Sequence, residues 1–277
     1  MEWRKLKNLI ILILLTVNAF LLVLVGARRE EAAEYERSAL EQTALVLENR
    51  GIAVDCSGLS AGDSLTPLGA GRELERELHM AQALLGKAVQ ADNRGGGLYL
   101  YHSGMGDLAM RTGGELSAEL GGSEDWRTDH PERHAAGLLK KMGIEGLLTG
   151  VTEEGDRTRV RFRQLWHGTP VFSCEVEFTY SSHFLRSIQG TLLTAGGGAA
   201  EAGRVLTLPT ALMRFSEEIA ATGDVCTAVY SMVPGYRGTT QSLSGGVRLT
   251  PVWLVDTDTG SFYLDGLTGA LTRAPEE

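Results

Sequence analysis

The amino-acid sequence predicts an α+β protein with one amino-terminal transmembrane helix, followed by extracytoplasmic units that each place a helix before an antiparallel sheet. Three observations lead to this fold class. An uncharged apolar stretch lies close to the amino terminus. Beyond it, apolar residues recur with helical spacing in some segments and alternate with polar residues in others. A Thr-Pro-Val-aromatic tetrad also occurs twice, at Thr169–Phe172 and at Thr250–Trp253.

The composition is that of an ordinary globular protein: 277 residues, 43% hydrophobic and 22% charged, which suffices for a sizeable core. The net charge of −9 argues against nucleic acid as a partner, because phosphate binding needs basic surfaces. The three cysteines, Cys56, Cys174 and Cys226, are far apart and odd in number, which argues against a disulfide framework. We interpret them as small buried side chains; one bridge with a spare thiol is the alternative.

The first element is the apolar segment Leu9–Ala27, which carries no charged residue. A helix of this length spans about 28 Å, close to the ~30 Å hydrocarbon core of a bilayer. We therefore predict a cytoplasmic tail at 1–8, a transmembrane helix at 9–27 and an extracytoplasmic body. A cleaved signal peptide is the alternative, because Val25-Gly26-Ala27 offers small residues for cleavage, although the apolar run is longer than a usual signal core.

Two polar residues, Thr16 and Asn18, lie inside the predicted span. Polar side chains in a membrane helix can bond to a neighbouring helix, so we predict that Thr16 and Asn18 contact a partner helix there. In the alternative interpretation, Thr16 bonds to the backbone of its own helix and Asn18 is merely tolerated.

A membrane-proximal α+β domain is predicted at 28–125. Its elements are a helix at Glu30–Arg50 stopped by Gly51, a short strand at Ile52–Cys56, a helix at Glu73–Leu85 and a β-hairpin over Gly97–Thr112.

A first α+β repeat is predicted at 126–194. Its helix begins near Asp129, which forms a capping-box pattern with Glu132; Pro131 occupies the first turn and Gly143 closes the helix. Strands follow at Arg157–Leu165, Val171–Tyr180 and Phe184–Thr191, and a glycine-rich linker is predicted at 195–206.

A second repeat at 207–277 has the same plan. A helix at Thr207–Thr222 precedes strands at Val225–Val233 and Val247–Asp256 and a closing hairpin, Phe262–Asp265 with Ala270–Arg273. The two tetrads fall at the same place in the two repeats. We expect Pro170 and Pro251 each to begin a strand, where the missing N–H costs no ladder bond, and the aromatic residue two positions on to face the core. Since the tetrad supplies no acid, base or ligand, the repeat is architectural.

Few patterns suggest chemistry. Gly58–Gly62 matches G-x-S-x-G around Ser60, but a loop follows where the nucleophile elbow requires a helix. His130 and His134 lie four apart, but Pro131 stands where the glutamate of H-E-x-x-H is needed. Asp256–Gly260 resembles the start of a calcium loop without its remaining ligands, and we interpret it as a β-turn. We therefore predict no metal site, no cofactor and no enzymatic activity.

The start "MEWRKLKNLIILILLTVNAFLL", the hairpin "GLYLYHSGMGDLAM" and the carboxy-terminal "LTPVWLVDTDTGSFYLDGLTGAL" together resemble the YycI and YycH proteins, regulators encoded with the WalK–WalR two-component system of Gram-positive bacteria. The closing pattern further resembles PepSY-type domains, which fits two repeats.

The resemblance implies a non-enzymatic, single-pass membrane regulator of a sensor histidine kinase in cell-wall homeostasis. It implies association with the kinase and with a YycH-like sister regulator, partly through the transmembrane helix. A second hypothesis is an extracytoplasmic PepSY-like module that binds a wall polymer or inhibits a protease. A third is an external hydrolase that uses Ser60 or the His130/His134 pair.

Overall fold

The computed structural model describes residues 2–60, 65–121, 123–194, 203, 205–240 and 246–275. The predicted α+β class is confirmed, with antiparallel pairing dominant in the sheet. The helices are α1 (Glu2–Asn49), α2 (Leu74–Leu85), α3 (Pro131–Lys141) and α4 (Leu208–Thr222), with 3₁₀ helices η1 (Cys56–Gly58) and η2 (Glu124–Trp126). The strands are β1 (Ala53–Val54), β2 (Leu68–Ala70), β3 (Gln90–Gly95), β4 (Leu98–Ser103), β5 (Gly106–Arg111), β6 (Glu115–Leu120), β7 (Glu145–Glu154), β8 (Arg157–Trp166), β9 (Thr169–Ser181), β10 (Phe184–Thr191), β11 (Ala228–Thr240), β12 (Val247–Thr257), β13 (Gly260–Asp265) and β14 (Leu271–Arg273).

The body contains three successive units of one helix followed by four antiparallel strands. They are α2 with β3–β6, α3 with β7–β10, and α4 with β11–β14, and within each unit every strand pairs with the next. The sequence predicts this plan for the third unit; in the second unit it predicts the helix and three of the four strands, so β7 is an addition. In the first unit it predicts the helix and only the central hairpin, so β3 and β6 are additions.

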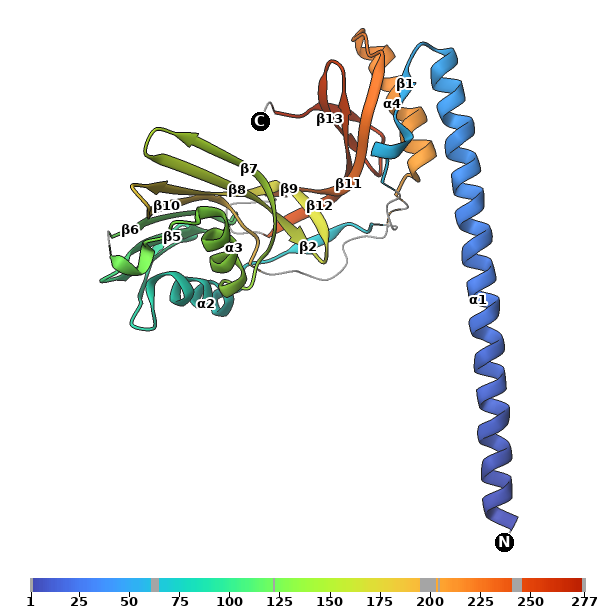
Figure 1. Ribbon diagram of the computed structural model, residues 1–277, viewed down its shortest axis with the longest axis horizontal. Coiled ribbons are helices and arrows are strands. Elements are labelled where there is room, and N and C mark those ends of the chain that lie inside the picture. The colour runs from blue at the N-terminus through green and yellow to red at the C-terminus, as the bar shows by residue number, and fades with distance from the viewer. Residues whose placement is uncertain are drawn as a thin grey trace.

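The first two units share one layer, because β6 pairs with β10. We call these eight strands, β3 to β10, sheet B. Helices α2 and α3 cover one face of sheet B (Figure 1), where Met80, Leu138, Phe162 and Phe178 belong to one core.

The third unit forms sheet A, which consists of β11–β14 with the short strands β1 and β2 at its margins. The face covered by α4 contains Leu212, Phe215, Trp253 and Phe262. Sheets A and B meet where β9 forms a parallel bridge to β11.

Helix α1 is continuous and extends far from the body at its amino-terminal end (Figure 1). Its last turns pack against α4, and Leu47 is fully buried there. Arg50, just after the helix, donates from Nη1 to Ser216 Oγ over 3.2 Å. Residues 9–27, the predicted span, lie within α1. Over the described residues, no helix combines the length and hydropathy needed to cross a membrane.

Two expectations about where elements begin are wrong. Asp129 does not cap α3: the residue at the cap position is His130, and no side chain bonds to the first turn. Pro251 does not begin a strand, because β12 starts four residues earlier. On the outer side of β12, β13 pairs with residues 252–257 and β2 with residues 247–249. Pro251 therefore lies between two partner strands, where its missing N–H costs no ladder bond.

Other expectations hold in whole or in part. Trp253 faces the core under α4, whereas Phe172 is buried in a separate small cluster with Val252 and Tyr263, so the expected core position is correct only for the second tetrad. Gly143 closes α3 with a φ of 75°, a conformation that glycine adopts without strain. The predicted linker at 195–206 lies mostly outside the described residues, apart from Gly203, Val205 and Leu206.

Candidate functional site

The candidate site is a cleft between the two sheet faces that the helices leave uncovered. On β8, Val160 and Phe162 face the helices, so the alternate side chains face the other way. On β12, Trp253 and Val255 face α4, so Leu254 and Asp256 face away from it. The contact of β9 with β11 brings these two open faces together.

The cleft has a volume of about 480 Å³, within the range of small-ligand pockets. We call it the inter-sheet cleft. Its wall from sheet B consists of Arg163, Phe172 and Glu175. Its wall from sheet A consists of Leu254, Asp256, Thr259, Gly260, Ser261, Tyr263, Arg273, Ala274 and Pro275.

The seam between the sheets, which we call the floor of the cleft, reaches the cleft through Phe172. Val171 forms the bridge to Tyr236, and the backbone N–H of Gly238 donates to Ser173 Oγ over 2.8 Å. Phe172, between them, packs on Tyr263 with ring centroids 5.6 Å apart. Gly235 is required there, because a Cβ atom would lie 2.4 Å from the Phe172 ring. The first tetrad thus joins the two sheets.

A row of arginines runs along the open face of sheet B. Arg157, Arg159, Arg161 and Arg163 alternate along β8 and therefore share one face. Glutamates of neighbouring strands face them: Arg163 Nη2 lies 3.2 Å from Glu175 Oε2, and Arg159 Nη2 lies 3.2 Å from Glu154 Oε2. The sequence analysis missed this row, although the R-x-R-x-R-x-R pattern in a predicted strand was a readable signal.

Asp256 is the central acid on the wall from sheet A. Its carboxylate accepts hydrogen bonds from Ser231 Oγ over 2.6 Å and from Ser261 Oγ over 2.7 Å, so strands on both sides hold it in place. Hydroxyl donors fix the orientation of a carboxylate but do not neutralise its charge. Within the described residues, no basic side chain forms an ion pair with Asp256.

The side chain of Arg273, at the edge of the cleft, points to the other face of sheet A, because it shares its side of β14 with Leu271, which packs in the core under α4. One of its N–H groups donates from Nη2 to the carbonyl oxygen of Thr259 over 2.7 Å, and its guanidinium lies 5.6 Å from the centre of the Phe262 ring. Among the described residues it has no carboxylate partner within ion-pair distance. The guanidinium is held in place but keeps donors for a further acceptor.

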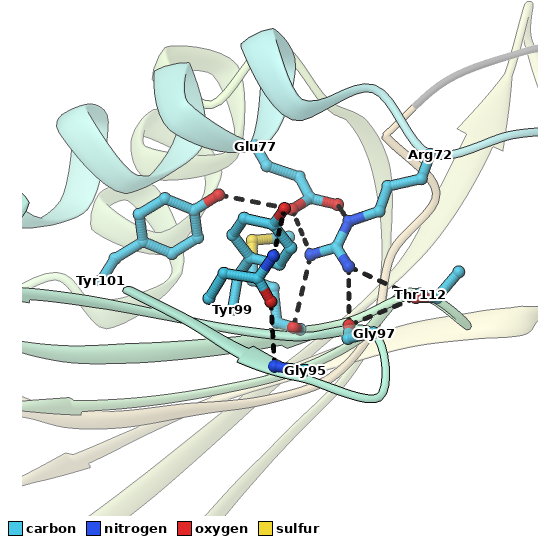
Figure 2. Close-up of polar contacts among 9 residues, drawn as sticks. Arg72, Glu77, Gly95, Gly97, Tyr99, Tyr101 and Thr112 are labelled. Atoms are coloured by element: carbon cyan, nitrogen blue, oxygen red, sulfur yellow. Dashed lines mark hydrogen bonds and ion pairs between the residues drawn. The ribbon is translucent and has the colours of Figure 1, made fainter. Parts of the chain in front are cut away.

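A second polar cluster lies in the first unit, under α2 (Figure 2). Arg72 binds Glu77 through two parallel hydrogen bonds of 2.7 and 2.6 Å, and Glu77 is only 2% exposed. The remaining Arg72 nitrogen donates to the Gly97 carbonyl oxygen over 2.6 Å, and the guanidinium stacks 4.4 Å from the centre of the Tyr99 ring. Burial, aided by the Glu77 charge, raises the pKa of Tyr101 to about 12. This cluster fastens α2 to the hairpins.

The Asp256–Gly260 segment is a turn between β12 and β13, as predicted. Its two acids face different partners. Asp258 accepts from the Thr227 hydroxyl over 2.6 Å and from the backbone N–H groups of Thr227 and Ala228. The Thr227 hydroxyl and these N–H groups lower the pKa of Asp258 to about 2.

The two residues predicted to bind a partner helix bond to their own helix. Thr16 Oγ1 donates to the Leu12 carbonyl oxygen and Asn18 Nδ2 to that of Leu14, both over 2.9 Å. Residues two positions apart on an α-helix are separated by a rotation of about 200°, so Thr16 and Asn18 point to nearly opposite sides of α1. They therefore cannot serve one contact together, and their role in partner binding stays a prediction.

The weaker candidates do not converge on one site. Ser60 is exposed, residues 61–64 after it lie outside the described residues, and its backbone N–H donates to the Met232 carbonyl oxygen. His134 packs edge-on against Trp126 and bonds through Nδ1 to Tyr180 over 3.0 Å, and burial lowers its pKa. His130 stands at the start of α3. In the described part of the chain, no three metal-binding side chains gather.

The cysteines are all unpaired. Cys174 and Cys226 are buried as expected, and burial raises the pKa of each thiol to about 11. The expectation is wrong for Cys56, which is exposed at the start of η1.

Comparison with known proteins yields fold similarity only. No family model matches the chain, and no curated protein matches it. The crystal structure of an uncharacterized protein from Eubacterium rectale ATCC 33656 has a TM-score of 0.50 at 13% identity, covering 81% of this chain and 91% of that one. The C-terminal domain of YpeB from Bacillus megaterium has a TM-score of 0.38 at 11% identity, covering 78% of this chain and all of that domain. The resemblance to YycI and YycH stays a prediction.

Proposed function

We propose that this chain is a non-enzymatic regulatory protein, anchored in the membrane by residues 9–27, with its amino terminus cytoplasmic and its body extracytoplasmic. Its proposed partner is a sensor histidine kinase, acting together with a YycH-like sister regulator in cell-wall homeostasis. The kinase, the sister protein and the PepSY-like character of the repeats come from the family resemblance. The proposal of a membrane anchor rests on the apolar segment at residues 9–27.

The observation that carries the proposal is the continuity of α1. Every Leu, Ile, Val and Phe from Ile10 to Val25 is between 39% and 74% exposed, which is a large apolar surface for a single helix. Apolar surfaces of this size are covered by a membrane or by another protein. The same helix packs on α4 through Leu40 and Leu47 without a break. A partner that contacts the apolar segment is thereby coupled to sheet A.

The test uses co-purification of the full chain with the sensor kinase of its own organism. We expect replacement of residues 9–27 by an unrelated apolar span to abolish co-purification and to alter kinase signalling. Asn18→Leu should weaken both, because it removes the only amide in the segment. The matched control is Asn49→Leu, the same substitution at the end of α1, outside the apolar segment. If both variants of the segment leave co-purification and signalling unchanged, contact through the helix is refuted.

The inter-sheet cleft favours a second candidate, an extracytoplasmic binding or protease-inhibitory module. In that case the body binds its target without help from the helix. Saturable binding of wall fragments or of an external protease that persists after replacement of residues 9–27 would support this candidate. If replacement of residues 9–27 abolishes both this binding and co-purification with the kinase, the second candidate is refuted.

A further inference from the structure

The two edge strands of sheet B differ in the side chains they present. Strand β3 forms one edge and β7 the other, because each pairs with a single neighbouring strand. Strand β3 has the sequence QADNRG, and charged residues such as its Asp92 and Arg94 protect an edge against pairing with other chains. Strand β7 has the sequence EGLLTGVTEE, and its middle contains no charge and no proline. Of the two edges, β7 is therefore the one suited to accept a further strand.

The backbone of β7 has groups available for such a strand. Along an edge strand, alternate residues direct their N–H and C=O groups away from the sheet. Strand β8 is the partner of β7, and no backbone hydrogen bond from elsewhere in the described part of the chain reaches residues 145–154. A β-bulge between Leu148 and Gly150 bends β7 but leaves a run of strand on either side of it. An added strand can pair with both runs.

An apolar groove runs beside β7 on the side of α3. Pairing with β8 sets Leu148 opposite Phe162 and Val151 opposite Val160, so both side chains face the side of sheet B that the helices cover. Helix α3 leaves them open: Leu148 is 42% exposed and Val151 is 38% exposed. The groove has a volume of about 550 Å³, and its apolar lining includes Ala136, Leu139, Ile144, Gly146 and Phe162. Alternate side chains of an added strand would cover Leu148 and Val151 and enter this groove.

An acid without a counter-charge lies on the same side of β7. Glu153 pairs with Thr158, and no basic side chain of the described residues lies within ion-pair distance of it. Glu154, on the other side of the strand, lies 3.2 Å from Arg159. A fitting partner therefore brings a positive charge to Glu153. A second copy of the chain does not fit, because in-register antiparallel pairing of two β7 strands sets Glu145 opposite Glu154, and opposed like charges destabilise a sheet.

We propose that β7 binds an extended segment of a partner protein, which adds to sheet B as a further strand. Its apolar side chains would face Leu148 and Val151, and a lysine or arginine would face Glu153. In complexes of this kind, main-chain hydrogen bonds give affinity and alternate side chains give specificity. The surface belongs to the body and rests neither on the membrane anchor nor on the kinase.

The experiment is fluorescence anisotropy with two labelled peptides, Lys-Thr-Val-Thr-Leu-Thr-Phe and the same residues in reverse order. Together they cover antiparallel and parallel addition with the lysine at the Glu153 end. The full chain is purified in a mild detergent, and detergent alone is the blank. We expect at least one of the two peptides to bind saturably.

Variants of the chain locate the binding. Leu148→Asp should weaken it about tenfold or more, because a charge replaces a buried apolar contact. The matched control is Leu147→Asp, the same substitution on the other side of β7, where Leu147 lies opposite Arg163 and is 52% exposed. This control should bind nearly as well as the unaltered chain. Both leucines are exposed, so both variants should fold, which thermal unfolding checks.

Variants of the peptide test the ladder and the charge. N-methylation of the apolar residues and N-methylation of the threonines block opposite edges of the bound strand, so one form should lose binding and the other should keep it. Replacing the peptide's lysine with glutamate should weaken binding about threefold, as for an exposed ion pair. Glu153→Lys in the chain should reverse this preference.

Five outcomes would overturn the proposal. The first is that neither peptide binds at high micromolar concentration. The second is that Leu148→Asp and Leu147→Asp weaken binding equally, and the third is that both methylated forms bind like the unmodified peptide. The fourth is that Glu153→Lys leaves the preference for lysine unchanged. The fifth is that light scattering finds a dimer that Leu148→Asp dissociates, because a second copy would then occupy β7.

Discussion

The Arg72–Glu77 cluster and the inter-sheet cleft use the same kinds of side chain in opposite ways. In the cluster, all three Arg72 nitrogens donate, and Glu77 accepts from Arg72 and Tyr101 (Figure 2). In the cleft, Asp256 is oriented by the hydroxyls of Ser231 and Ser261 and has no basic partner among the described residues. A closed network of buried charges serves the fold, whereas oriented charges without counter-charges can bind something else.

The largest effect is expected from opening the closed network. Glu77→Ala leaves the Arg72 guanidinium, whose side chain is 14% exposed, without its carboxylate. Breaking a buried ion pair in this way costs about 3–5 kcal/mol of unfolding free energy, measurable by urea denaturation.

The control for this variant is Glu73→Ala, which removes the exposed partner of Arg76 and should cost less than about 1 kcal/mol. The double variant Arg72→Met/Glu77→Leu should recover most of the lost stability, because it removes both charges. Equal costs for Glu77→Ala and Glu73→Ala would contradict the distinction between closed and open clusters.

An intermediate effect is expected at the floor of the cleft. In Gly235→Ala the new Cβ atom would lie 2.4 Å from Phe172 Cε2 and 2.7 Å from the Pro170 carbonyl oxygen. Overpacking of this kind costs about 1–3 kcal/mol, measurable by the same denaturation assay. The control is Gly137→Ala, in the middle of α3 with open space around it, which should be neutral or stabilising. Gly223 cannot serve as the control, because its φ of 78° would strain an alanine. A neutral Gly235→Ala variant would show that the seam is looser than described.

A small effect is expected from neutralising the open cluster. Asp256→Asn keeps an oxygen for one serine and offers an amide to the other, so the unfolding free energy should change by less than about 1 kcal/mol. Thermal unfolding compares it with Glu77→Gln, the equivalent amide change in the closed cluster, which should cost more. If Asp256→Asn were the more destabilising of the two, Asp256 would be a structural residue.

The smallest effect is expected from an acid that is exposed but internally bonded, Asp258. Its pKa is lowered to about 2, so the folded state binds the proton less readily than the unfolded state. Its contribution to stability is therefore complete above pH ~4, the ordinary value for an aspartate, and is lost as the pH falls toward 2. Asp258→Asn should flatten this part of the stability–pH curve, recorded by denaturation at several pH values. An unchanged slope would show that other carboxyl groups account for it.

Helices were the part of the fold that sequence patterns predict best. Leu208, Leu212, Phe215 and Ile219 repeat with helical spacing, and all four lie on the buried side of α4. Strand β3 was missed because all of its residues are exposed, which leaves no alternation to detect. Strand β6 does alternate, with Leu116, Ala118 and Leu120 buried, and could have been found.

The inter-sheet cleft was beyond sequence reasoning for a physical reason. Its walls come from strands β8, β9 and β12–β14, and their meeting depends on register. The arginine row could be read from β8 alone, but its pairing with Glu175 requires the alignment of β8 with β9. Asp256 was noticed only as part of a turn, because nothing local indicates that Ser231 lies opposite it.

The order of the chain has a consequence for synthesis. Helix α1 is made first, yet Arg50 bonds to Ser216, which lies 166 residues later. Strands β1 and β2 likewise cannot pair until their partners β11 and β12 have been synthesised. While the ribosome is still making the middle of the protein, the first two units can complete their shared sheet, but Leu40 and Leu47 have no surface to pack on. Sheet A is therefore the last part of the molecule to mature, and the nascent chain is the state in which a chaperone would find those leucines uncovered.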